Sequence, residues 1–369
     1  MTSAGSLREV EGAEAESRLS ELQTPFLTID LDATERNIEA MQRYCNQHEI
    51  ALRPHVKTHK MPQLAELQLR AGAVGLTCQK LSEAGVFVGL DRCSDVLISF
   101  PVAGTGKPEQ FADLAARVRL TVGADSMAVL KPLANALQDR QATAGFLVDC
   151  DTGYQRTGVQ TPADAAELAE LGNQLPQLEF RGLMTHPTQP ASGPWLLEAK
   201  KRIEQGGLEV VCVSGGGTPG AFQTHEISVV TELRVGTYVF GDRRCLDSGT
   251  ISLSDCALRI RSTVVSTPTA TRVILDAGSK SLTCDLGLDV HGVTYGLIVE
   301  YPDAKIYALS EEHAHVDVSS CGIRPEVGET VTIIPNHACG AVNLHSEAAL
   351  HRGGAGVHVL PVAARGCVR

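Results

Sequence analysis

A lysine stands between two histidines in the stretch 54–60, which reads PHVKTHK. The stretch follows a short apolar run and is expected to end a β-strand, where His55, Lys57 and His59 would share one face. Cationic or apolar neighbours lower the pKa of a lysine amine, and a lysine that forms a Schiff base must lose its proton. The alternative is a solvated basic strand end, and this segment alone does not exclude it.

A glycine-rich segment, SGGGTPG at 214–220, follows an apolar run. Its glycines allow backbone N–H groups to converge on an anion, and Thr218 adds a hydroxyl. No Gly-Lys-Ser/Thr follows, so it is not a Walker loop. The segment predicts a phosphate site, with a flexible turn as the alternative.

Two further stretches contain residues that could bind a cofactor or a metal. Arg156, in DCDTGYQRTG at 149–158, could hold a cofactor heteroatom or pair with Asp149 or Asp151. His337 and Cys339, in PNHACGAVN at 335–343, would share a face in an extended chain. Imidazole and thiolate are zinc ligands, and two protein ligands leave positions for water and substrate.

Alternating β-strands and α-helices are expected to position these residues. Between residues 30 and 245 the sequence predicts about eight βα units with mostly continuous apolar strands, as in a parallel sheet covered on both faces. The fold class is therefore α/β, a TIM-type (β/α)8 barrel, with an open doubly wound sheet as the alternative. No G-x-G-x-x-G follows the first strand, which argues against a dinucleotide site. Asp32 is expected to cap the first helix, over 33–48.

The pattern changes after Asp255, where short strands alternate with turns and few helix signals remain. This predicts a separate β-rich module of roughly 115 residues. The expected domains are a frayed tail at 1–23, a barrel at 24–250 and a β-rich domain at 251–369 that carries the His337 motif. The first strand, 24–30, could instead pair with the C-terminal module.

Composition excludes several classes of protein. The chain has 369 residues, 43% hydrophobic and 20% charged, which is typical of a soluble globular protein. A net charge of -11 without a long basic run argues against a nucleic-acid partner. No apolar stretch reaches about 18 residues, so no membrane span is expected. The acidic start lacks a signal core, and the 11 scattered cysteines are expected to be reduced thiols in the cytoplasm.

Taken together and in order, these motifs resemble the D-threonine aldolase and D-serine dehydratase family. The resemblance runs from about residue 24 to Val362 and includes GTYVFGD at 236–242, DAGSKSLT at 276–283 and SEEH at 310–313. Members are fold-type III pyridoxal phosphate enzymes, similar to the N-terminal barrel of alanine racemase. The resemblance implies a PLP-binding barrel, a divalent metal and a homodimer.

The resemblance also implies roles for individual residues. Lys57 looks like the lysine that holds the cofactor covalently, and Arg156 like the arginine that faces the pyridoxal ring. Gly216, Gly217 and Thr218 look like the phosphate ligands, with Tyr238 nearby. His337 and Cys339 look like ligands of zinc, or alternatively of manganese or magnesium. His186 is expected near the cofactor, although the loop after it departs from the family pattern.

Two reactions on a D-3-hydroxy amino acid are open. If Lys57 takes the Cα proton, the β-hydroxyl leaves and a 2-keto acid and ammonia result. If the hydroxyl loses its proton instead, Cα–Cβ breaks to give glycine and an aldehyde, and His59 is a candidate base for that path. The resemblance pairs the metal histidine with aspartate in aldolases and with cysteine in dehydratases. Cys339 therefore favours a dehydratase of D-serine or D-3-hydroxyaspartate type.

A barrel of this kind is compatible with two other functions. An amino-acid racemase would need a second base on the opposite face of the substrate and no metal. A non-catalytic pyridoxal-phosphate protein would resemble the barrel alone, and the β-rich module and the H-x-C motif argue against it. His313 and His315 could support the metal site or pair with neighbouring acids.

Overall fold

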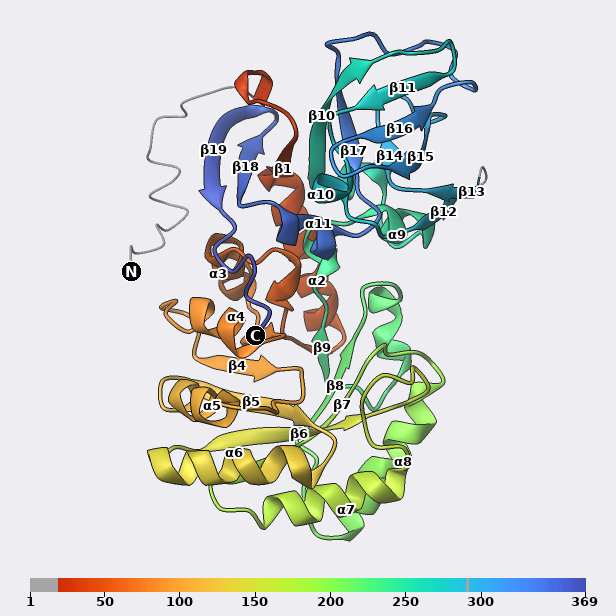
Figure 1. Ribbon diagram of the computed structural model, residues 1–369. Helices are drawn as coiled ribbons and strands as arrows, with labels where there is room; N and C mark the ends of the chain where they lie inside the picture. The colour runs from red at the N-terminus through yellow and green to blue at the C-terminus, as the bar shows by residue number, and fades with distance from the viewer. Residues whose placement is uncertain (1–18, 290–291) are drawn as a thin grey trace. The chain divides into compact units, whose positions relative to one another are not determined.

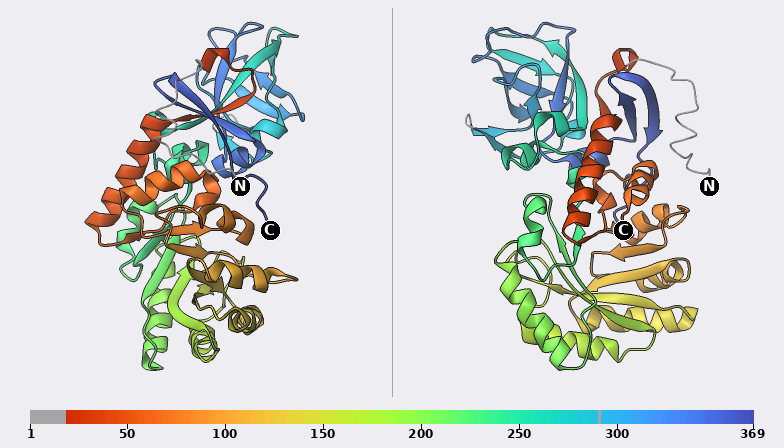
Figure 2. Two further views of the ribbon diagram at one scale, coloured as in Figure 1. Left: turned by 90° about the vertical axis from the view of Figure 1, so that its left-hand side faces the viewer. Right: turned by 180° about the vertical axis from the view of Figure 1, so that it is seen from behind.

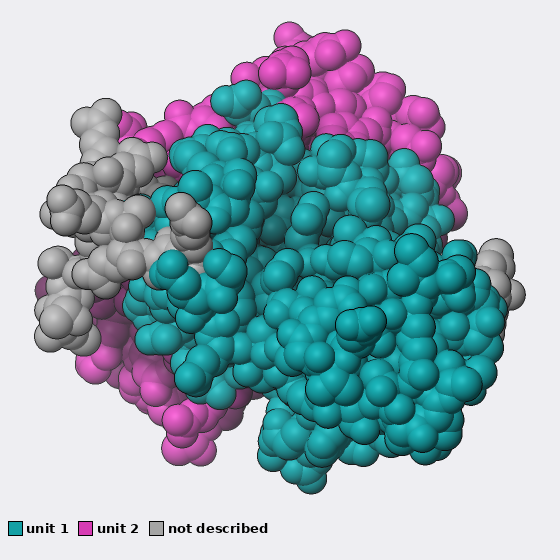
Figure 3. All heavy atoms as spheres, turned by 90° about the horizontal axis from the view of Figure 1, so that it is seen from above, with its two compact units in different colours: residues 1–39, 58–63, 237–366 teal, residues 40–57, 64–236, 367–369 magenta. Residues whose placement is uncertain are grey.

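The structure is a computed structural model that describes residues 19–289 and 292–369. It divides into two compact units, coloured separately in Figure 3. Unit 1 contains residues 1–39, 58–63 and 237–366, and unit 2 contains residues 40–57, 64–236 and 367–369. Most of the predicted N-terminal tail lies outside the described residues, and Leu19–Glu21 forms a 3-10 helix, η1. The domain boundary at residue 250 stays a prediction.

Unit 2 is built on eight parallel strands in the order β2-β9-β8-β7-β6-β5-β4-β3. These strands are β2 (Ala51–Leu52), β3 (Leu76–Cys78), β4 (Asp95–Ile98), β5 (Arg119–Ala124), β6 (Ala144–Cys150), β7 (Leu178–Thr185), β8 (Cys212–Gly216) and β9 (Glu232–Arg234). Every residue of β4 and β6 is buried, which explains the continuous apolar runs of the sequence.

The sheet curls until its two outermost strands meet. His55, beyond the end of β2, forms a parallel bridge with Thr77 of β3. The N–H of Val74 donates to the carbonyl of Leu52 at 2.9 Å, and the N–H of Thr77 donates to the carbonyl of Pro54 at 2.8 Å. These contacts close the barrel, so the predicted TIM-type architecture is confirmed and the open doubly wound sheet is not.

Helices alternate with these strands along the chain, as predicted. They are α2 (Leu31–Gln47), α3 (Pro62–Ala71), α4 (Leu81–Phe87), α5 (Lys107–Ala115), α6 (Met127–Arg140), α7 (Pro162–Asn173) and α8 (Ser192–Gln205). Figures 1 and 2 show α5 to α8 on the outer side of the strands. The predicted cap of the first helix is wrong by two residues. The Asp30 carboxylate accepts the N–H groups of Asp32 and Ala33, because β1 ends there and the helix begins at Leu31.

Unit 1 contains a nine-stranded, mostly antiparallel sheet. Its strands are β1 (Phe26–Asp30), β10 (Leu258–Ser266), β11 (Arg272–Leu275), β14 (Leu297–Ile298), β15 (Lys305–Leu309), β16 (Ala314–Asp317), β17 (Thr330–Ile334), β18 (Glu347–Arg352) and β19 (Ala355–Pro361). β1 runs antiparallel to β10 and parallel to β18, so the first strand of the chain belongs to this sheet. Buried and half-buried residues alternate along most of β10, as expected for a sheet with one face on a core.

Short elements complete unit 1. They are the helices α9 (Arg243–Asp247), α10 (Ser279–Leu282) and α11 (Ala338–Leu344) and the hairpin strands β12 (Gly287–Asp289) and β13 (Gly292–Thr294). The 11 cysteines are free thiols, as predicted. Among the described residues, no helix is both long enough and apolar enough to cross a membrane.

Candidate active site

Lys57 lies in a 3-10 turn, η2 (Val56–Thr58), and not in a strand. The predicted strand, with His55, Lys57 and His59 on one face, is therefore wrong. β2 ends at Leu52, and the neighbouring β9 ends at Arg234. The last ladder-like bond runs from the N–H of His55 to the carbonyl of Val235, at 2.8 Å. Beyond this bond β9 has ended, and the chain leaves the sheet and closes a turn.

The His55 side chain hydrogen-bonds the backbone of this turn. Its Nδ1 accepts the backbone N–H of Lys57 at 3.4 Å, while Nε2 lies 3.0 Å from Gln79 Oε1 and 3.2 Å from Ser99 Oγ. Burial, and then the charge of Lys57, lower the pKa of His55 well below its usual value. A neutral ring that accepts at Nδ1 must donate from Nε2, and this donor faces Gln79 and Ser99. The ring is thereby oriented, and its Nδ1 fixes the position of the Lys57 backbone.

His59 is fully buried. Its Nδ1 accepts the backbone N–H of Met61 at 3.1 Å, and its ring meets Phe240 edge-on at a centroid distance of 6.4 Å. The ring is therefore held by its own segment and by an apolar neighbour. Its role as a base stays a prediction.

The glycine-rich segment begins inside β8, because this strand extends to Gly216. The N–H of Gly216 donates to Thr188 Oγ1 at 2.7 Å. Gly217 has φ +116°, which favours glycine, and Thr218 is buried. Among the described residues no acceptor is recorded for the N–H groups of Gly217 and Thr218. These two groups could bind an anion, whereas the N–H of Gly216 is used within the protein.

Arg156 is exposed and pairs with neither predicted acid within the part of the chain that the structure describes. Asp149 accepts the hydroxyl of Thr157 at 2.7 Å, and Asp151 accepts backbone N–H groups of its own loop. The Arg156 guanidinium lies 5.8 Å from the ring centroid of Tyr154, and that ring meets His186 edge-on at 5.7 Å. Arg156, Tyr154 and His186 therefore form one group.

Arg234, at the end of β9, was not singled out from the sequence. It is buried, its Nε donates to Ser214 Oγ at 2.7 Å, and its Nη2 donates to the carbonyl of Thr185 at 2.7 Å. A Cβ on Gly216 would lie 3.5 Å from Arg234 Nη1 and 3.4 Å from His186 Nδ1, so the glycine keeps this space open. The sequence feature that could have indicated Arg234 is a charged residue at the end of an apolar strand, since charged residues are rarely buried without a partner.

Three cations surround His186. Burial, followed by Arg156, Arg234 and Lys57, lowers the pKa of His186 to about 3, so its ring is neutral. Asp149 is one of the acids nearby, and burial raises its pKa while Thr157, Arg234 and Arg156 oppose that shift. This excess of positive charge beside the open N–H groups of Gly217 and Thr218 fits a phosphorylated, anionic cofactor.

The predicted metal ligands lie in unit 1, at the start of α11. His337 is the N-cap residue of this helix and Cys339 lies in its first turn, so the expectation of an extended chain is wrong. The cause is Asp242, whose carboxylate accepts the N–H of Ala338 at 3.1 Å and starts the helix. The two side chains still interact. The Cys339 contact, opposed by burial and aided by Asp285, raises the pKa of His337 to about 9.

Further side chains support this pair. Asp285 Oδ2 lies 3.0 Å from His337 Nδ1, Thr58 Oγ1 lies 3.1 Å from Cys339 Sγ, and Thr237 Oγ1 lies 3.8 Å from the same sulfur. Among the described residues, no group of three His, Cys, Asp or Glu side chains gathers at metal-binding distance. A carboxylate on Nδ1 leaves Nε2 for a metal, so His337 and Cys339 fit a divalent ion with two protein ligands.

Asp285 and Thr58 were not predicted as parts of this site. A Cβ on Gly340 would lie 3.1 Å from Asp285 Oδ2, so α11 approaches the carboxylate closely only with glycine there. The other histidines of interest lie elsewhere. His315, in β16, hydrogen-bonds Ser310 at 3.1 Å, and His313 is exposed. Tyr238 is buried in η4 (Thr237–Val239).

Comparison with known proteins identifies the family. Residues 29–244 match the model of the alanine racemase N-terminal domain, and residues 257–350 match a putative serine dehydratase domain. A D-threonine aldolase from an Arthrobacter species is 32% identical, with 95% of each chain covered. The chain belongs to the D-threonine aldolase and D-serine dehydratase family. The D-threo-3-hydroxyaspartate dehydratase of Delftia is 28% identical over 86% of this chain and 91% of its own.

Solved structures of this family agree. The D-threonine aldolase of Filomicrobium marinum has a TM-score of 0.86 at 32% identity, covering 95% of this chain and 98% of its own. The Delftia dehydratase has a TM-score of 0.83 at 26% identity, covering 94% and 99%. This member of the family is therefore an enzyme, a pyridoxal phosphate-dependent lyase that uses a divalent metal, and the predicted recognition is confirmed.

Proposed function

We propose that this enzyme eliminates water from a D-3-hydroxy amino acid, of the D-serine or D-3-hydroxyaspartate type, to give a 2-keto acid and ammonia. The observation that carries the proposal is Cys339, in the first turn of α11, beside His337. A thiolate and an imidazole favour zinc, a strong Lewis acid, and a Lewis acid on the β-oxygen assists the departure of hydroxide.

The residues of unit 2 would hold pyridoxal phosphate. Lys57 would bind it covalently, and the N–H groups of Gly217 and Thr218 would bind its phosphate. Arg234, Arg156 and His186 would face the ring, and Tyr238 of unit 1 stays a proposed ligand. When bound, the cofactor supplies an electron sink for charge at Cα, and the metal supplies a Lewis acid.

The protein groups perform the proton transfers. Lys57 Nζ, once released by the substrate amine, is the proposed base for the Cα proton. Its backbone is fixed by Nδ1 of His55, so the amine starts from one position. His186 stays neutral near pH 7 because its pKa is about 3. It can therefore accept a hydrogen bond without adding a fourth positive charge to this group of residues.

Solved relatives support elimination. Two solved structures of a D-threo-3-hydroxyaspartate dehydratase carry alanine in place of a histidine and of a cysteine two positions apart, and the structure of the cysteine variant is the metal-free form. His337 and Cys339 of this chain have the same spacing. A histidine and a cysteine at this spacing in a dehydratase support the choice of elimination.

A retro-aldol cleavage is the second candidate, and overall similarity favours it. The chain is 32% identical to the Arthrobacter D-threonine aldolase and 31% identical to a 3-hydroxy-D-aspartate aldolase of Paracoccus denitrificans, against 28% for the Delftia dehydratase. In this reaction the base takes the hydroxyl proton, and His59 is the candidate. Overall identity averages over the whole chain, whereas Cys339 would bind the metal that activates the β-oxygen, so Cys339 favours elimination.

The remaining alternatives have less support. A racemase would need no metal, and a protein that only binds the cofactor would need no serine dehydratase-type domain, which residues 257–350 match. We also propose a homodimer in the cytoplasm, on the family resemblance and on the free thiols.

Product analysis tests the proposal. The holoenzyme is incubated with D-serine, D-threonine and D-3-hydroxyaspartate, with and without a metal chelator, and keto acid, ammonia, glycine and aldehyde are measured. We expect keto acid and ammonia as the main products, loss of activity with chelator, and no reaction of the L-isomers. Faster release of glycine and acetaldehyde from D-threonine than of ammonia from any substrate would establish the aldolase. Full activity after verified metal removal would favour the racemase.

A further inference from the structure

A cavity of about 780 Å³ opens in unit 2 at the end of the barrel opposite the proposed cofactor residues. Its lining includes the first residues of six strands: Asp95 of β4, Arg119 of β5, Ala144 of β6, Leu178 of β7, Cys212 of β8 and Glu232 of β9. The proposed cofactor residues follow the other ends of the strands. TIM barrels are usually filled by layers of side chains, so a space of this size needs an explanation.

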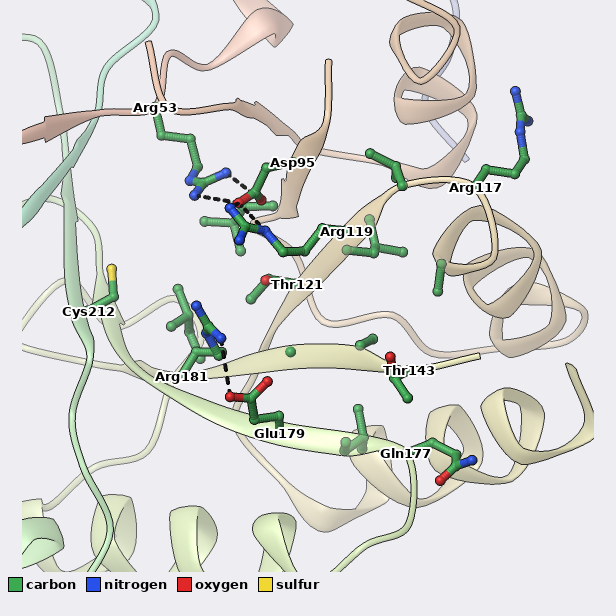
Figure 4. Close-up of a pocket in the computed structure, with 18 of the residues that line it drawn as sticks. Arg53, Asp95, Arg117, Arg119, Thr121, Thr143, Gln177, Glu179, Arg181 and Cys212 are labelled. Carbon is green, nitrogen blue, oxygen red and sulfur yellow. Dashed lines mark hydrogen bonds and ion pairs between the residues drawn. The ribbon is translucent and has the colours of Figure 1, made fainter. Parts of the chain in front are cut away.

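Four arginines line the cavity, whereas the whole chain is acidic. They are Arg53, Arg117, Arg119 and Arg181, against the three acids Asp95, Glu179 and Glu232, which leaves a formal charge of +1. Figure 4 shows Arg119 and Arg181 extending toward the same part of the cavity, while Arg117 points away from it. Without Arg117 the other three arginines equal the three acids in number, and Arg119 and Arg181 are the guanidinium groups directed toward this part of the cavity.

The strand register places these two arginines on one face. Thr121 pairs with Gly145, and Gly145 pairs with Glu179, so β5, β6 and β7 lie side by side. A Cβ on Gly145 would lie 2.8 Å from Arg181 Cγ and 3.0 Å from Thr121 Oγ1. Arg119 is two residues before Thr121 and shares its face. The glycine therefore leaves room for Arg181 to lie over the inside of the sheet.

The acids do not use all the donors of these arginines. Arg53 is fully engaged, with Nε on Glu232 at 2.8 Å and its other nitrogens on Asp95. Arg119 directs Nε and Nη2 to Asp95, and Arg181 directs only Nη1 to Glu179, at 3.1 Å. Within the described residues, Nη1 of Arg119 and Nε and Nη2 of Arg181 have no recorded acceptor. A guanidinium has five N–H donors in a fork that fits carboxylate and phosphate oxygens.

We propose that this cavity binds a small organic anion, whose carboxylate or phosphate oxygens pair with Arg119 and Arg181. Apolar residues such as Leu97 and Leu147 form the remaining walls and would contact a short carbon skeleton. The site is distinct from the catalytic machinery and does not depend on which reaction the enzyme performs. A polar layer that contains only water is the alternative.

Calorimetric titration of the cofactor-loaded enzyme tests this inference. Loading with pyridoxal phosphate keeps phosphate probes away from the glycine-rich segment. The probes are succinate, glycerol 3-phosphate and inorganic phosphate, with succinamide as the uncharged comparator. We expect one anion per chain to bind with a Kd of about 1 mM or below, and succinamide not to bind. Preference for succinate or for the phosphates identifies the anionic group that the site takes.

Variants locate the binding. Arg181→Gln should weaken anion binding about 10-fold or more, because a charge-assisted contact with the anion is lost. The substitution also leaves Glu179 without this ion pair, but Glu179 is exposed to solvent. Gly145→Ala should also weaken binding, since its methyl displaces Arg181 without changing the net charge. The matched control is Arg202→Gln, which removes a similar exposed ion pair on α8. Turnover should stay within about twofold of wild type in all three variants.

Some outcomes overturn the proposal. These are the absence of binding by every anion at about 10 mM, and equal weakening by Arg181→Gln and Arg202→Gln, which would mean a general charge effect. Arg119→Gln is a second direct variant, since Arg53 still pairs with Asp95 when Arg119 is replaced. If Arg119→Gln does not fold, Arg181→Gln and Gly145→Ala decide the question.

Discussion

The hydroxyl oxygen of Thr58 lies 3.1 Å from the sulfur of Cys339, although 281 positions separate them in the chain. Thr58 is also the residue that directly follows Lys57. One peptide bond therefore connects the proposed cofactor lysine to a residue that contacts the proposed metal thiol. A hydroxyl that donates to a thiolate stabilises its charged form, which is the form that binds metal.

Thr58→Val should weaken zinc binding about 10-fold, because valine has the same shape but cannot donate to the sulfur. Zinc affinity is measured by competition with a chromogenic chelator. Thr237→Val is the graded control, since that hydroxyl lies 3.8 Å from Cys339 and should matter less. Equal effects of the two substitutions would contradict a specific Thr58–Cys339 contact.

Asp285→Asn should lower zinc affinity about 10- to 100-fold, because Asp285 accepts from His337 Nδ1 and keeps Nε2 in position for the metal. The measurement is metal content after dialysis against a graded series of free zinc concentrations. Glu312→Gln, which removes an exposed acid paired with Lys280, is the control and should bind zinc like wild type. Wild-type zinc affinity in Asp285→Asn would exclude the orienting role.

Cys339→Asp should shift the products toward glycine and reduce the preference for zinc over manganese. A carboxylate suits harder ions and makes the metal a weaker aid to hydroxide departure. The ratio of keto acid to glycine is measured with D-3-hydroxyaspartate at saturating zinc and at saturating manganese. Cys321→Asp, at a half-buried thiol, controls for a new acid. An unchanged ratio in a folded, metal-loaded Cys339→Asp protein would remove Cys339 as the determinant.

Borohydride reduction of the yellow holoenzyme should attach the cofactor to Lys57, as peptide mapping by mass spectrometry can show. Lys57→Ala should abolish turnover of every substrate, because covalent attachment and the Cα base are lost together. Lys280→Ala, at an exposed lysine paired with Glu311 and Glu312, should keep full activity. A label on Lys60 or Lys280 in wild type would show that the assignment is wrong.

Stability should fall as the pH drops below about 6.5, because the unfolded chain protonates His186 there while the folded chain resists until its pKa of about 3. The folded-state pKa is lowered, so this contribution is complete above the unfolded pKa and disappears toward pH 3. Each such histidine changes the unfolding free energy by up to ~1.4 kcal/mol per pH unit in this window.

Urea unfolding of wild type and His186→Asn at pH 7.5 and 5.5 checks this expectation. The variant should lose less stability between the two pH values than wild type does. Some loss should remain in the variant, since His55 also has a pKa well below its usual value. Identical losses in the two proteins would assign the pH dependence to other groups.

The sequence alone determined the local elements and the order of the motifs. The predicted alternation of strands and helices between residues 30 and 245 and the predicted change to short strands after Asp255 are both observed. Their apolar periodicity and their Pro and Gly neighbours act over a few residues, so they are present in the sequence itself. The alternation of such elements was also enough to predict the barrel.

Only the tertiary structure decided which distant residues meet. β1 joins the C-terminal sheet by pairing with β10 and β18. Both partners lie more than 200 residues later in the chain, so the local sequence of β1 does not contain this pairing. Lys57 lies in a turn, beyond the point at which the neighbouring β9 ends. Asp285 reaches His337 only because Gly340 lets a helix come close, and Arg234 is buried beside His186 by the closure of the barrel. Such long-range pairings depend on backbone packing between segments, which no short stretch of sequence contains.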